Sequence, residues 1–283
     1  MKFGIAFSNM QRGLIDRLKI LDNIVIEAEK LEYDSFFTMD HYMLPWGNET
    51  FETWVYLAYL AGKTSKIKLG TCVTPIPFRP PTLLAKVVST LDIVSGGRVV
   101  VGVGLGWYQT EFEAYSSWDS NLVRFEKTKE ALDIITKLWV EEKVNFEGKY
   151  YKVKDAILQP KPIQKPYPPL WFGGTGRKML KLAAEKGEGW IPVGPRWAPT
   201  YVTAEDYSKF TEKIKKIRKN IGKTNEFTFA CIMAPHENFN EFAKEIEAYK
   251  KAGMNYFVLG IVRVKDGLDL LKRFKDEIIS TIT

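Results

Sequence analysis

Short apolar runs alternate along the chain with longer segments in which apolar residues recur every three or four positions. The short runs are nearly continuous, which is typical of strands covered on both faces of a parallel sheet. The longer segments have the period of amphipathic helices. We expect strands at residues 3–7, 35–39, 67–73, 98–104, 169–174, 189–193, 226–233 and 255–260. We expect helices at residues 18–31, 51–61, 80–94, 125–139, 177–186, 204–221, 240–252 and 267–279.

Eight strands that alternate with helices predict a single (β/α)₈ TIM barrel domain over residues 1–283. An open doubly wound sheet is the alternative, but the even spacing of the units favours closure. The fifth unit is irregular, since residues 144–153 have the pattern of a hairpin that turns at Glu147 and Gly148. Five prolines between residues 160 and 169 exclude a helix there. We interpret residues 144–169 as a surface excursion and not as a linker.

The composition is that of an ordinary globular protein, with 45% apolar and 27% charged residues. The longest stretch without a charged side chain, residues 99–110, is shorter than the roughly 20 residues that cross a membrane. The first residues lack the apolar core of a signal peptide, so we expect a cytoplasmic protein. Cys72 and Cys231 fall in expected strands without a CxxC pattern, and the chain has two histidines, so we expect no metal site.

The net charge is 41 − 34 = +7, which raises the question of a nucleic-acid partner. The densest basic run, residues 213–220, is interleaved with Ile214, Ile217 and Ile221 at helical spacing. That pattern is typical of a helix with one buried stripe and a solvated basic face, so we expect no nucleic-acid binding. The excess charge could instead attract a polyanionic small molecule.

In a barrel of this kind the active site lies where the strands end, and four of these junctions are unusual. Asp40 and His41 follow the second expected strand. A histidine changes charge near neutral pH and can transfer protons, and a neighbouring carboxylate can fix its tautomer. A lone histidine can also be structural, but the position at a strand end favours a catalytic pair.

Cys72, Val73 and Thr74 end the third expected strand, and three prolines follow within seven positions. A strand end so constrained can present its backbone to a flat ligand, or it can be only a rigid loop. No base lies near Cys72 in the sequence. We therefore interpret Cys72 as a small buried hydrophobic residue and not as a nucleophile.

Glycines at positions 102, 104 and 106 precede Trp107, but their spacing is not the G-x-G-x-x-G of a dinucleotide fold. Neither Gly-Lys-Thr sequence of the chain has the glycine that a P-loop needs five residues earlier. The three glycines indicate instead that something large approaches the backbone here.

The fourth junction is Gly173, Gly174, Thr175, Gly176 and Arg177, between a strand and a helix. Successive backbone N–H groups at a helix N-terminus, with Thr175 able to cap and Arg177 nearby, suit a phosphate group. A tight turn with positive φ would account for one or two of these glycines, but not for three.

Taken together, Asp40-His41, the segment GRVVVGVGLGWYQTEFEAYS (residues 97–116) and the segment LWFGGTGRKMLKLAAEKGEGW (residues 170–190) resemble the bacterial luciferase-like family. The resemblance extends from residue 3 to about residue 271. It is strongest to the branch of deazaflavin-dependent reductases and dehydrogenases that is often labelled methylenetetrahydromethanopterin-reductase-like.

This resemblance implies a barrel that holds coenzyme F420, or alternatively FMN, over its mouth. It implies a cis peptide bond between Cys72 and Val73 behind the ring, and a homodimer formed through helices near residues 51–94. His41 would donate or accept the proton, and Asp40 would give electrostatic support. The implied cofactor-binding residues are Cys72, Val73, Thr74, Gly104, Gly106, Trp107, Gly173, Gly174, Thr175, Gly176 and Arg177. The oligoglutamate tail of F420 would suit the basic excess.

The sequence departs from the sugar-phosphate dehydrogenase of this family at two points. In that enzyme a tryptophan follows the active-site histidine by four residues, whereas here Trp46 follows His41 by five. That enzyme also has a glutamate directly after the G-x-G of its fourth strand, whereas the next carboxylate in this chain is Glu111. The sequence therefore does not assign the identity of the substrate. We expect Trp46, Glu111 and Trp190 near it.

Three functions remain at this point. The first is an oxidoreductase that transfers hydride between F420 and a small organic substrate. The second is an FMN-dependent monooxygenase supplied by a separate reductase. The third is a flavin-binding barrel without turnover.

Overall fold

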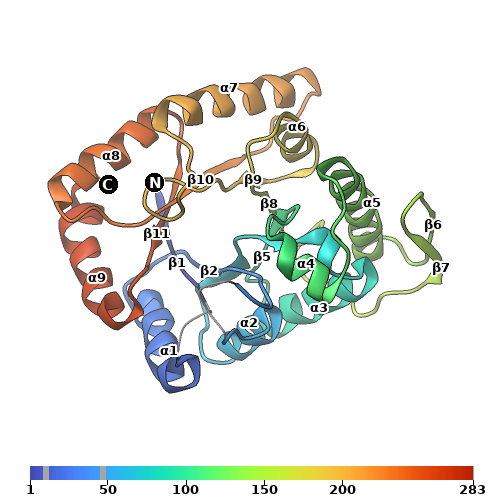
Figure 1. The fold of residues 1–283 in the computed structure, drawn as a ribbon, viewed down its shortest axis with the longest axis horizontal. Helices are drawn as coiled ribbons and strands as arrows, with labels where there is room; N and C mark the ends of the chain where they lie inside the picture. The colour runs from blue at the N-terminus through green and yellow to red at the C-terminus, as the bar shows by residue number, and fades with distance from the viewer. Residues whose placement is uncertain (9–12, 45–48, 283) are drawn as a thin grey trace.

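The computed structural model describes residues 1–8, 13–44 and 49–282. Their strands form a closed parallel barrel inside a ring of helices (Figure 1). The barrel order is β3 (Lys68–Thr71), β2 (Ser35–Thr38), β1 (Lys2–Phe7), β11 (Tyr256–Gly260), β10 (Thr228–Met233), β9 (Gly189–Trp190), β8 (Leu170–Phe172) and β5 (Val99–Gly104). Closure comes from β3 and β5, which pair at Leu69 with Val99 and at Gly70 with Val100. The TIM barrel prediction is confirmed.

The third strand position is divided into two pieces. β3 pairs with β5 at Val99 and Val100, and the short strand β4 (Thr74–Pro75) then pairs with the carboxyl-terminal part of β5, at Val103 and Gly104. Between β3 and β4 the Cys72–Val73 peptide bond is cis, as the family resemblance implied. The sequence pattern predicted one continuous strand here, so the break is a departure from that expectation.

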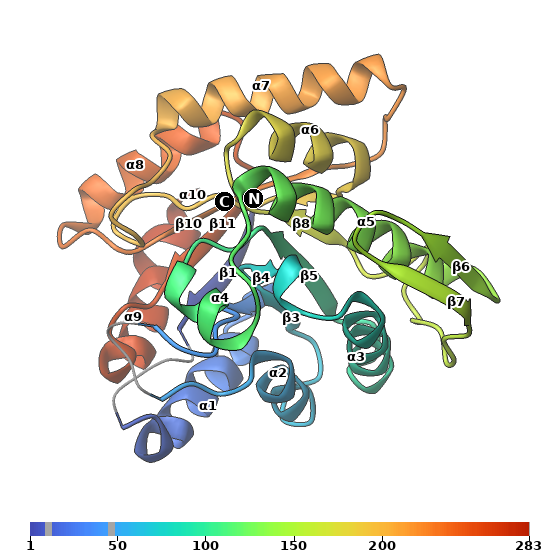
Figure 2. The ribbon, with the colours of Figure 1, turned by 45° about the vertical axis from the view of Figure 1, so that its right-hand side comes forward.

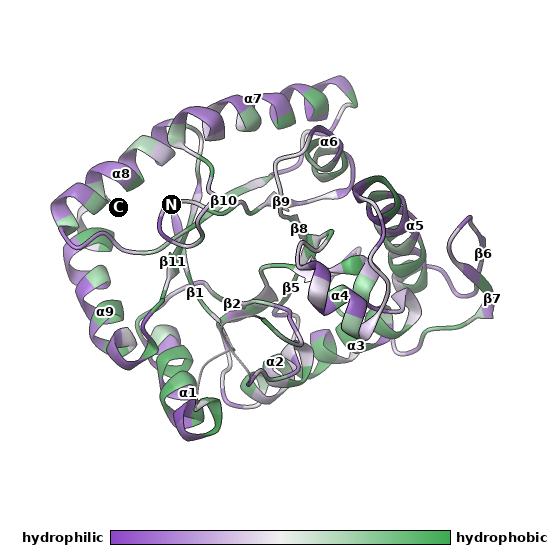
Figure 3. Cartoon of the chain, viewed as in Figure 1, coloured by the Kyte–Doolittle hydropathy of each residue, from purple (hydrophilic) through white to green (hydrophobic). Residues whose placement is uncertain are grey.

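The expected helices are all present within a few residues. They are α1 (Leu14–Lys30), α2 (Thr53–Ala61), α3 (Pro81–Val94), α5 (Asn121–Val140), α6 (Arg177–Lys186), α7 (Ala204–Asn220), α8 (Phe239–Lys251) and α9 (Gly267–Phe274). Short turns of helix follow at η1 (Ile76–Phe78), η2 (Val264–Asp266), η3 (Lys275–Ile279) and α10 (Ser280–Ile282). Hydrophobic and hydrophilic residues alternate along the outer helices (Figure 3), as expected when one face packs on the barrel. No helix within the described ranges is long and apolar enough to cross a membrane.

One helix was missed. α4 (Gln109–Tyr115) lies in a stretch that the sequence pattern assigned to a loop. It buries only Glu111 and Phe112, so the apolar repeat is too short to give a helical signal.

Aromatic side chains fill part of the barrel interior. The ring of Trp171 lies 5.3 Å from that of Phe37 and 5.0 Å from that of Tyr256. A Cβ atom at Gly70 would lie 2.7 Å from the Phe37 ring, and one at Gly189 would lie 2.6 Å from Trp171. These glycines make room for the aromatic layer. This layer makes the barrel interior a packed core and not a pore.

The hairpin of β6 (Val144–Glu147) and β7 (Lys152–Ala156) is a separate antiparallel sheet outside the ring (Figure 2). Glu130 of α5 accepts hydrogen bonds from the backbone N–H groups of Lys149, Tyr150 and Tyr151 in its turn. These bonds hold the hairpin against α5. Residues 157–169 form neither helix nor strand.

Candidate active site

The residues that the sequence singled out after strands lie at one rim of the barrel. Asp40 follows β2, Val73 precedes β4, Gly104 ends β5, and Gly173 follows β8. All these strands are parallel, so their carboxyl ends share one edge.

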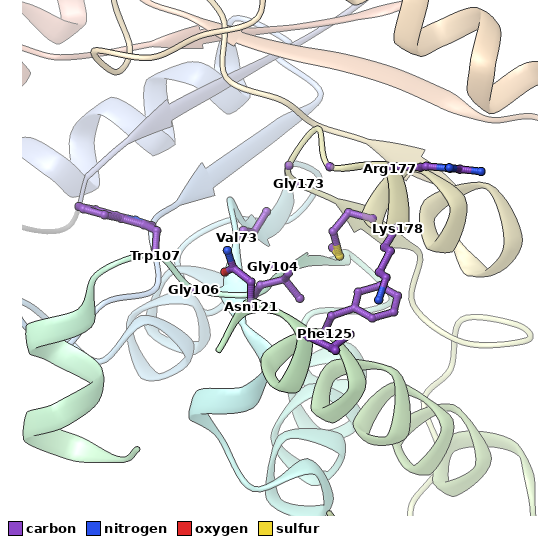
Figure 4. Close-up of a pocket in the computed structure, with 14 residues that line it drawn as sticks. Val73, Gly104, Gly106, Trp107, Asn121, Phe125, Gly173, Arg177 and Lys178 are labelled. Atoms are coloured by element: carbon purple, nitrogen blue, oxygen red, sulfur yellow. The ribbon is translucent and has the colours of Figure 1, made fainter. Parts of the chain in front are cut away.

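A pocket of about 600 Å³ lies at this rim between β4, β5 and the first turns of α5 and α6 (Figure 4). Eight of the expected cofactor residues line it, namely Val73, Gly104, Gly106, Trp107, Gly173, Gly174, Gly176 and Arg177. The sequence pattern did not find the rest of the lining, which is Leu105, Asn121, Leu122, Phe125, Lys178 and Met179. Because helix α5 begins four residues earlier than its apolar repeat indicated, Asn121 and Leu122 lay outside the expected helix.

Val73 occupies the space that two of the glycines leave open. A Cβ atom at Gly104 would lie 2.4 Å from Val73 Cγ2, and one at Gly173 would lie 3.2 Å from Val73 Cγ1. The Val73 side chain therefore forms an apolar floor for the pocket.

The interpretation of the glycines before Trp107 needs a correction. A Cβ atom at Gly102 would lie 1.9 Å from the carbonyl oxygen of Thr71, and one at Gly106 would lie 2.3 Å from the ring of Phe112. The groups that approach these glycines, like Val73 at Gly104, belong to the protein itself. Gly104 and Gly106 line the pocket, but their lack of a side chain is explained by internal packing.

The turn before α6 is open to the pocket. Gly174 has φ +84°, and Gly176 is the N-cap of α6 without a side-chain cap. Thr175, expected to cap the helix, does not do so. A Cβ atom at Gly176 would meet nothing within 4 Å. The positive end of the helix dipole and its free N–H groups therefore face open space, which suits an anion.

Trp190 supports this turn from the core. Its Nε1 donates a hydrogen bond of 2.9 Å to the carbonyl oxygen of Gly174, and its ring packs on Tyr207. The side chain is fully buried and is not part of the pocket lining. The expectation of Trp190 at the substrate is therefore wrong, because the side chain points into the helix layer behind the glycine turn.

His41 is paired with Glu111 of α4. The distance from His41 Nδ1 to Glu111 Oε2 is 2.7 Å, and both side chains are buried. Glu111 Oε1 also accepts hydrogen bonds from the backbone N–H groups of Tyr42, at 2.5 Å, and Met43, at 3.1 Å. Glu111 was expected near the substrate, but it lies behind His41 and does not line the pocket.

Within the described part of the chain, no hydrogen bond or ion pair joins the side chain of Asp40 to that of His41. Its carboxylate accepts two hydrogen bonds from Arg79, in the loop after η1. The carboxylate beside His41 is therefore Glu111, whereas Asp40 anchors the neighbouring loop.

Trp107 connects His41 to the pocket. Its ring meets the imidazole edge-on at a centroid distance of 5.8 Å, and the side chain lines the pocket while 56% exposed. Figure 4 shows Trp107 at the side of the pocket opposite to Arg177. Trp46 lies outside the described residues.

The thiol of Cys72 is not activated as a nucleophile. Burial raises its pKa to about 12, so it is protonated at neutral pH. Cys72 packs against the residues that fill the barrel interior, as expected for a small hydrophobic residue, but it is partly and not fully buried. No group of histidine, cysteine and acidic side chains that could hold a metal ion occurs among the described residues.

Residues 1–260 match the family described as luciferase-like monooxygenase. The chain belongs to this family. The shared region contains the strand-end histidine, the cis bond and the glycine turn of the pocket.

Two curated relatives place the chain within this family. The chain is 34% identical over 218 residues to the F420-dependent glucose-6-phosphate dehydrogenase of Microbacterium testaceum, covering 76% of this chain and 60% of that protein. It is 31% identical over 136 residues to the FMNH2-dependent dimethylsulfone monooxygenase of Pseudomonas putida, covering 48% and 37%. The chain thus spans 60% and 37% of the length of these two relatives, less than two thirds in each case.

The fold is also that of a solved structure, an F420-dependent secondary alcohol dehydrogenase in complex with an F420-acetone adduct. The TM-score is 0.84 at 24% identity, covering 100% of this chain and 99% of the other. This similarity establishes the barrel architecture.

Proposed function

We propose that the protein is an oxidoreductase that transfers hydride between coenzyme F420 and a small organic substrate. The observation that carries this proposal is the uncapped start of α6, which faces a pocket of about 600 Å³ whose opposite side is joined to His41 through Trp107. The similarity to F420-dependent dehydrogenases supports the choice of cofactor.

The residues around the pocket fit a deazaflavin phosphate. The backbone N–H groups between Gly174 and Arg177 would hold the phosphate, since the glycines leave room for it. The ring system would rest on Val73 and the apolar side chains of Phe125 and Met179. Bound F420 supplies the centre that accepts or releases hydride.

The protein's own contribution is position, exclusion of water and proton transfer. His41 is 6% exposed and lies beside the pocket residue Trp107, where it can exchange a proton with substrate. Asp40, held by Arg79, keeps the loop that begins with His41 in place.

The charge near the phosphate site favours F420 over FMN. FMN ends at its phosphate, whereas F420 continues into an acidic tail. Arg177 and Lys178 lie at this end of the pocket, where Arg177 points outward and Lys178 lies over the ring of Phe125 (Figure 4). Two cations at this position could pair with the carboxylates of the tail.

An FMN-dependent monooxygenase is the second candidate. The similarity to the dimethylsulfone monooxygenase favours it, and it would need a separate reductase to supply reduced FMN. An apolar pocket with one glycine-rich phosphate site would accept either ring system.

We also propose that two copies of the chain form a homodimer through α2 and α3. These neighbouring helices expose Val55 (68%), Leu83 (56%) and Val94 (61%). Apolar side chains gathered on adjacent helices are typical of a protein interface.

The decisive experiment is a pair of anaerobic titrations with F420 and with FMN, followed by turnover of a panel of alcohols and carbonyl compounds. We expect F420 to bind more tightly and its absorbance to change on addition of substrate. His41→Ala should keep the F420 affinity but lower turnover by about 10² to 10⁴-fold. Oxygen consumption with reduced FMN would support the second candidate instead. Tight binding without any turnover would support a non-catalytic barrel.

A further inference from the structure

A second pocket, of about 300 Å³, lies at the end of the barrel opposite to the candidate active site. It is formed by the last turns of α7, the loop that follows and the start of β10. Because β10 begins at Thr228, this is the amino-terminal end of the strands, whereas Gly104 and Gly173 lie at their carboxyl ends. We propose that this pocket binds a small anion that carries two or more phosphate groups. The proposal goes beyond the hydride transfer proposed above and does not depend on it.

All the charged residues that line this pocket are positive. Of the nine lining residues, four are cations and none is acidic, the cations being Lys215, Arg218, Lys219 and Lys223. The segment from residue 213 to residue 225 contains six cations and no acidic residue. A concave surface lined by one sign of charge concentrates the electric field and attracts ions of the opposite sign. Four positive charges are matched best by an anion with several negative charges.

Two of the cations lie over aromatic rings of the pocket. The guanidinium of Arg218 is 4.6 Å from the centroid of the Phe227 ring. The Nζ atom of Lys215 is 5.8 Å from the centroid of the Phe229 ring, and it also pairs with Glu212. Arg218 is 5% exposed, and within the described chain its hydrogen bonds go to carbonyl and amide oxygens, which carry no net charge. The ring therefore helps to fix the charge of Arg218 beside the pocket without neutralising it.

The other two cations, Lys219 and Lys223, form no ion pair with any residue that the structure describes. Lys219 is exposed in the last turn of α7, and Lys223 is half-buried in the loop. Burial lowers the pKa of Lys223, and the charge of Arg218 lowers it further, although Glu188 opposes both. The carboxylate of Glu188 accepts a hydrogen bond from the N–H of Leu170 and does not line the pocket. A bound anion would stabilise the charged form of Lys223.

The shape of the pocket favours a small anion over a nucleic acid. A nucleic acid covers an extended basic face of at least several hundred Å². Here the four cations converge from α7 and from the loop after it on one cavity of about 300 Å³. Lysine ammonium groups bind phosphate as point charges, so they do not require the planar geometry that arginine pairs with a carboxylate. The pocket therefore fits a compact anion with several phosphate oxygens.

The first test is calorimetric titration of the protein with magnesium-free pyrophosphate at low ionic strength. We expect the double variant Lys219→Gln/Lys223→Gln to bind pyrophosphate at least about tenfold more weakly than wild type, because two charge-assisted contacts are lost. The matched control is Lys213→Gln/Lys216→Gln, which removes the same charge from the same helix outside the pocket. The control should keep the wild-type affinity. An equal loss in both variants would reduce the effect to net charge and overturn the proposal.

The second test locates the bound anion, because pyrophosphate could also bind at the glycine turn before α6. Protein labelled with ¹⁵N-lysine is titrated and followed by ¹H–¹⁵N correlation, and Lys219→Gln and Lys223→Gln assign the two signals. We expect the backbone signals of Lys219 and Lys223 to shift on addition of pyrophosphate, in wild type and in Gly176→Val alike. Shifts confined to Lys178, beside the glycine turn, would overturn the proposal.

The chemical class of the ligand is tested by competition. We expect citrate, which carries carboxylates, and a short DNA duplex to bind more weakly than pyrophosphate. Equal or tighter binding of either would overturn the assignment to a small phosphate-bearing anion, as would the absence of pyrophosphate binding at millimolar concentration. The double variant should keep its F420 affinity within a factor of about two, because the pocket shares no lining residue with the candidate active site.

Discussion

Arg79 holds the carboxylate of Asp40 through two hydrogen bonds, from Nε to Oδ2 at 3.0 Å and from Nη2 to Oδ1 at 2.6 Å. The side chain of Asp40 is fully buried, and that of Arg79 is 12% exposed. Arg79 Nη2 also lies 2.5 Å from Oε1 of Glu52, the N-cap of α2. Burial lowers the pKa of Arg79, but the charges of Asp40 and Glu52 outweigh it and raise the pKa above its ordinary value. One guanidinium thus joins the loop after β2 to the start of α2.

We expect Arg79→Ala to destabilise the protein by about 3 to 5 kcal/mol, because it leaves the buried Asp40 carboxylate without a partner. Urea denaturation followed by circular dichroism measures this change. Lys244→Ala is the control, since Lys244 pairs with Glu241 on the surface, and it should leave the midpoint unchanged. A midpoint for Arg79→Ala equal to that of wild type would mean that the Asp40–Arg79 pair contributes nothing to the fold.

The phosphate site is best tested at Gly176 and not at Gly174. A side chain at Gly174 would be strained at φ +84°, so loss of binding there could come from the backbone. Gly176 has φ −61° and open space around its Cβ position. We expect Gly176→Val to weaken F420 binding by at least about tenfold, since each lost charge-assisted hydrogen bond costs about 1.5 to 3 kcal/mol.

The readout for Gly176→Val is a fluorescence titration of F420 with the folded variant. Gly62→Val serves as the matched control, because Gly62 ends α2 with an ordinary φ of −76° and a Cβ there makes only an ordinary contact. Wild-type affinity in Gly176→Val would place the phosphate elsewhere on the rim.

The sequence alone was sufficient to predict the barrel fold and the end of the barrel at which the candidate site lies. Strand ends share one edge in any parallel barrel, so His41 and Gly173 could be placed together without knowledge of their distance. The glycine turn before α6 was also readable, because Gly-Gly-Thr-Gly between a strand and a helix has few structural alternatives.

The partners of the acidic residues could not be predicted. Asp40 is next to His41 in the chain, yet it binds Arg79, which is 39 positions away. Glu111 reaches His41 across 70 positions, from a helix too short to show a periodic pattern. Sequence neighbours at a strand end leave the strand in different directions, and only the tertiary packing decides what each one meets.

Cys72 should be unreactive in the folded protein. Burial holds the pKa of its thiol at about 12, so the thiolate is scarce at pH 8. Cys231 is fully buried, and burial raises the pKa of its thiol as well. We expect a disulfide reagent such as DTNB at pH 8 to modify neither thiol in the native protein and both after denaturation. Cys72→Ala should retain F420-dependent turnover within a factor of a few, whereas loss of turnover with intact F420 binding would give Cys72 a chemical role.

The exposed apolar side chains of α2 and α3 lead to the last prediction. A stable homodimer buries about 800 Å² on each partner, and a charge placed in the centre of such an interface is desolvated without a partner. Leu83 is 56% exposed in the first turn of α3. We therefore expect Leu83→Glu to convert a dimer into a monomer in analytical ultracentrifugation. The thermal midpoint of the wild-type protein should rise with concentration, and that of the variant should not, because association adds stability only to the dimer. Ile221→Glu is the control, since Ile221 is similarly exposed at 47% but lies at the end of α7, and it should leave the wild-type mass unchanged. A wild-type protein that sediments as a monomer at every concentration would refute the dimer and leave the apolar surface of α2 and α3 without this role.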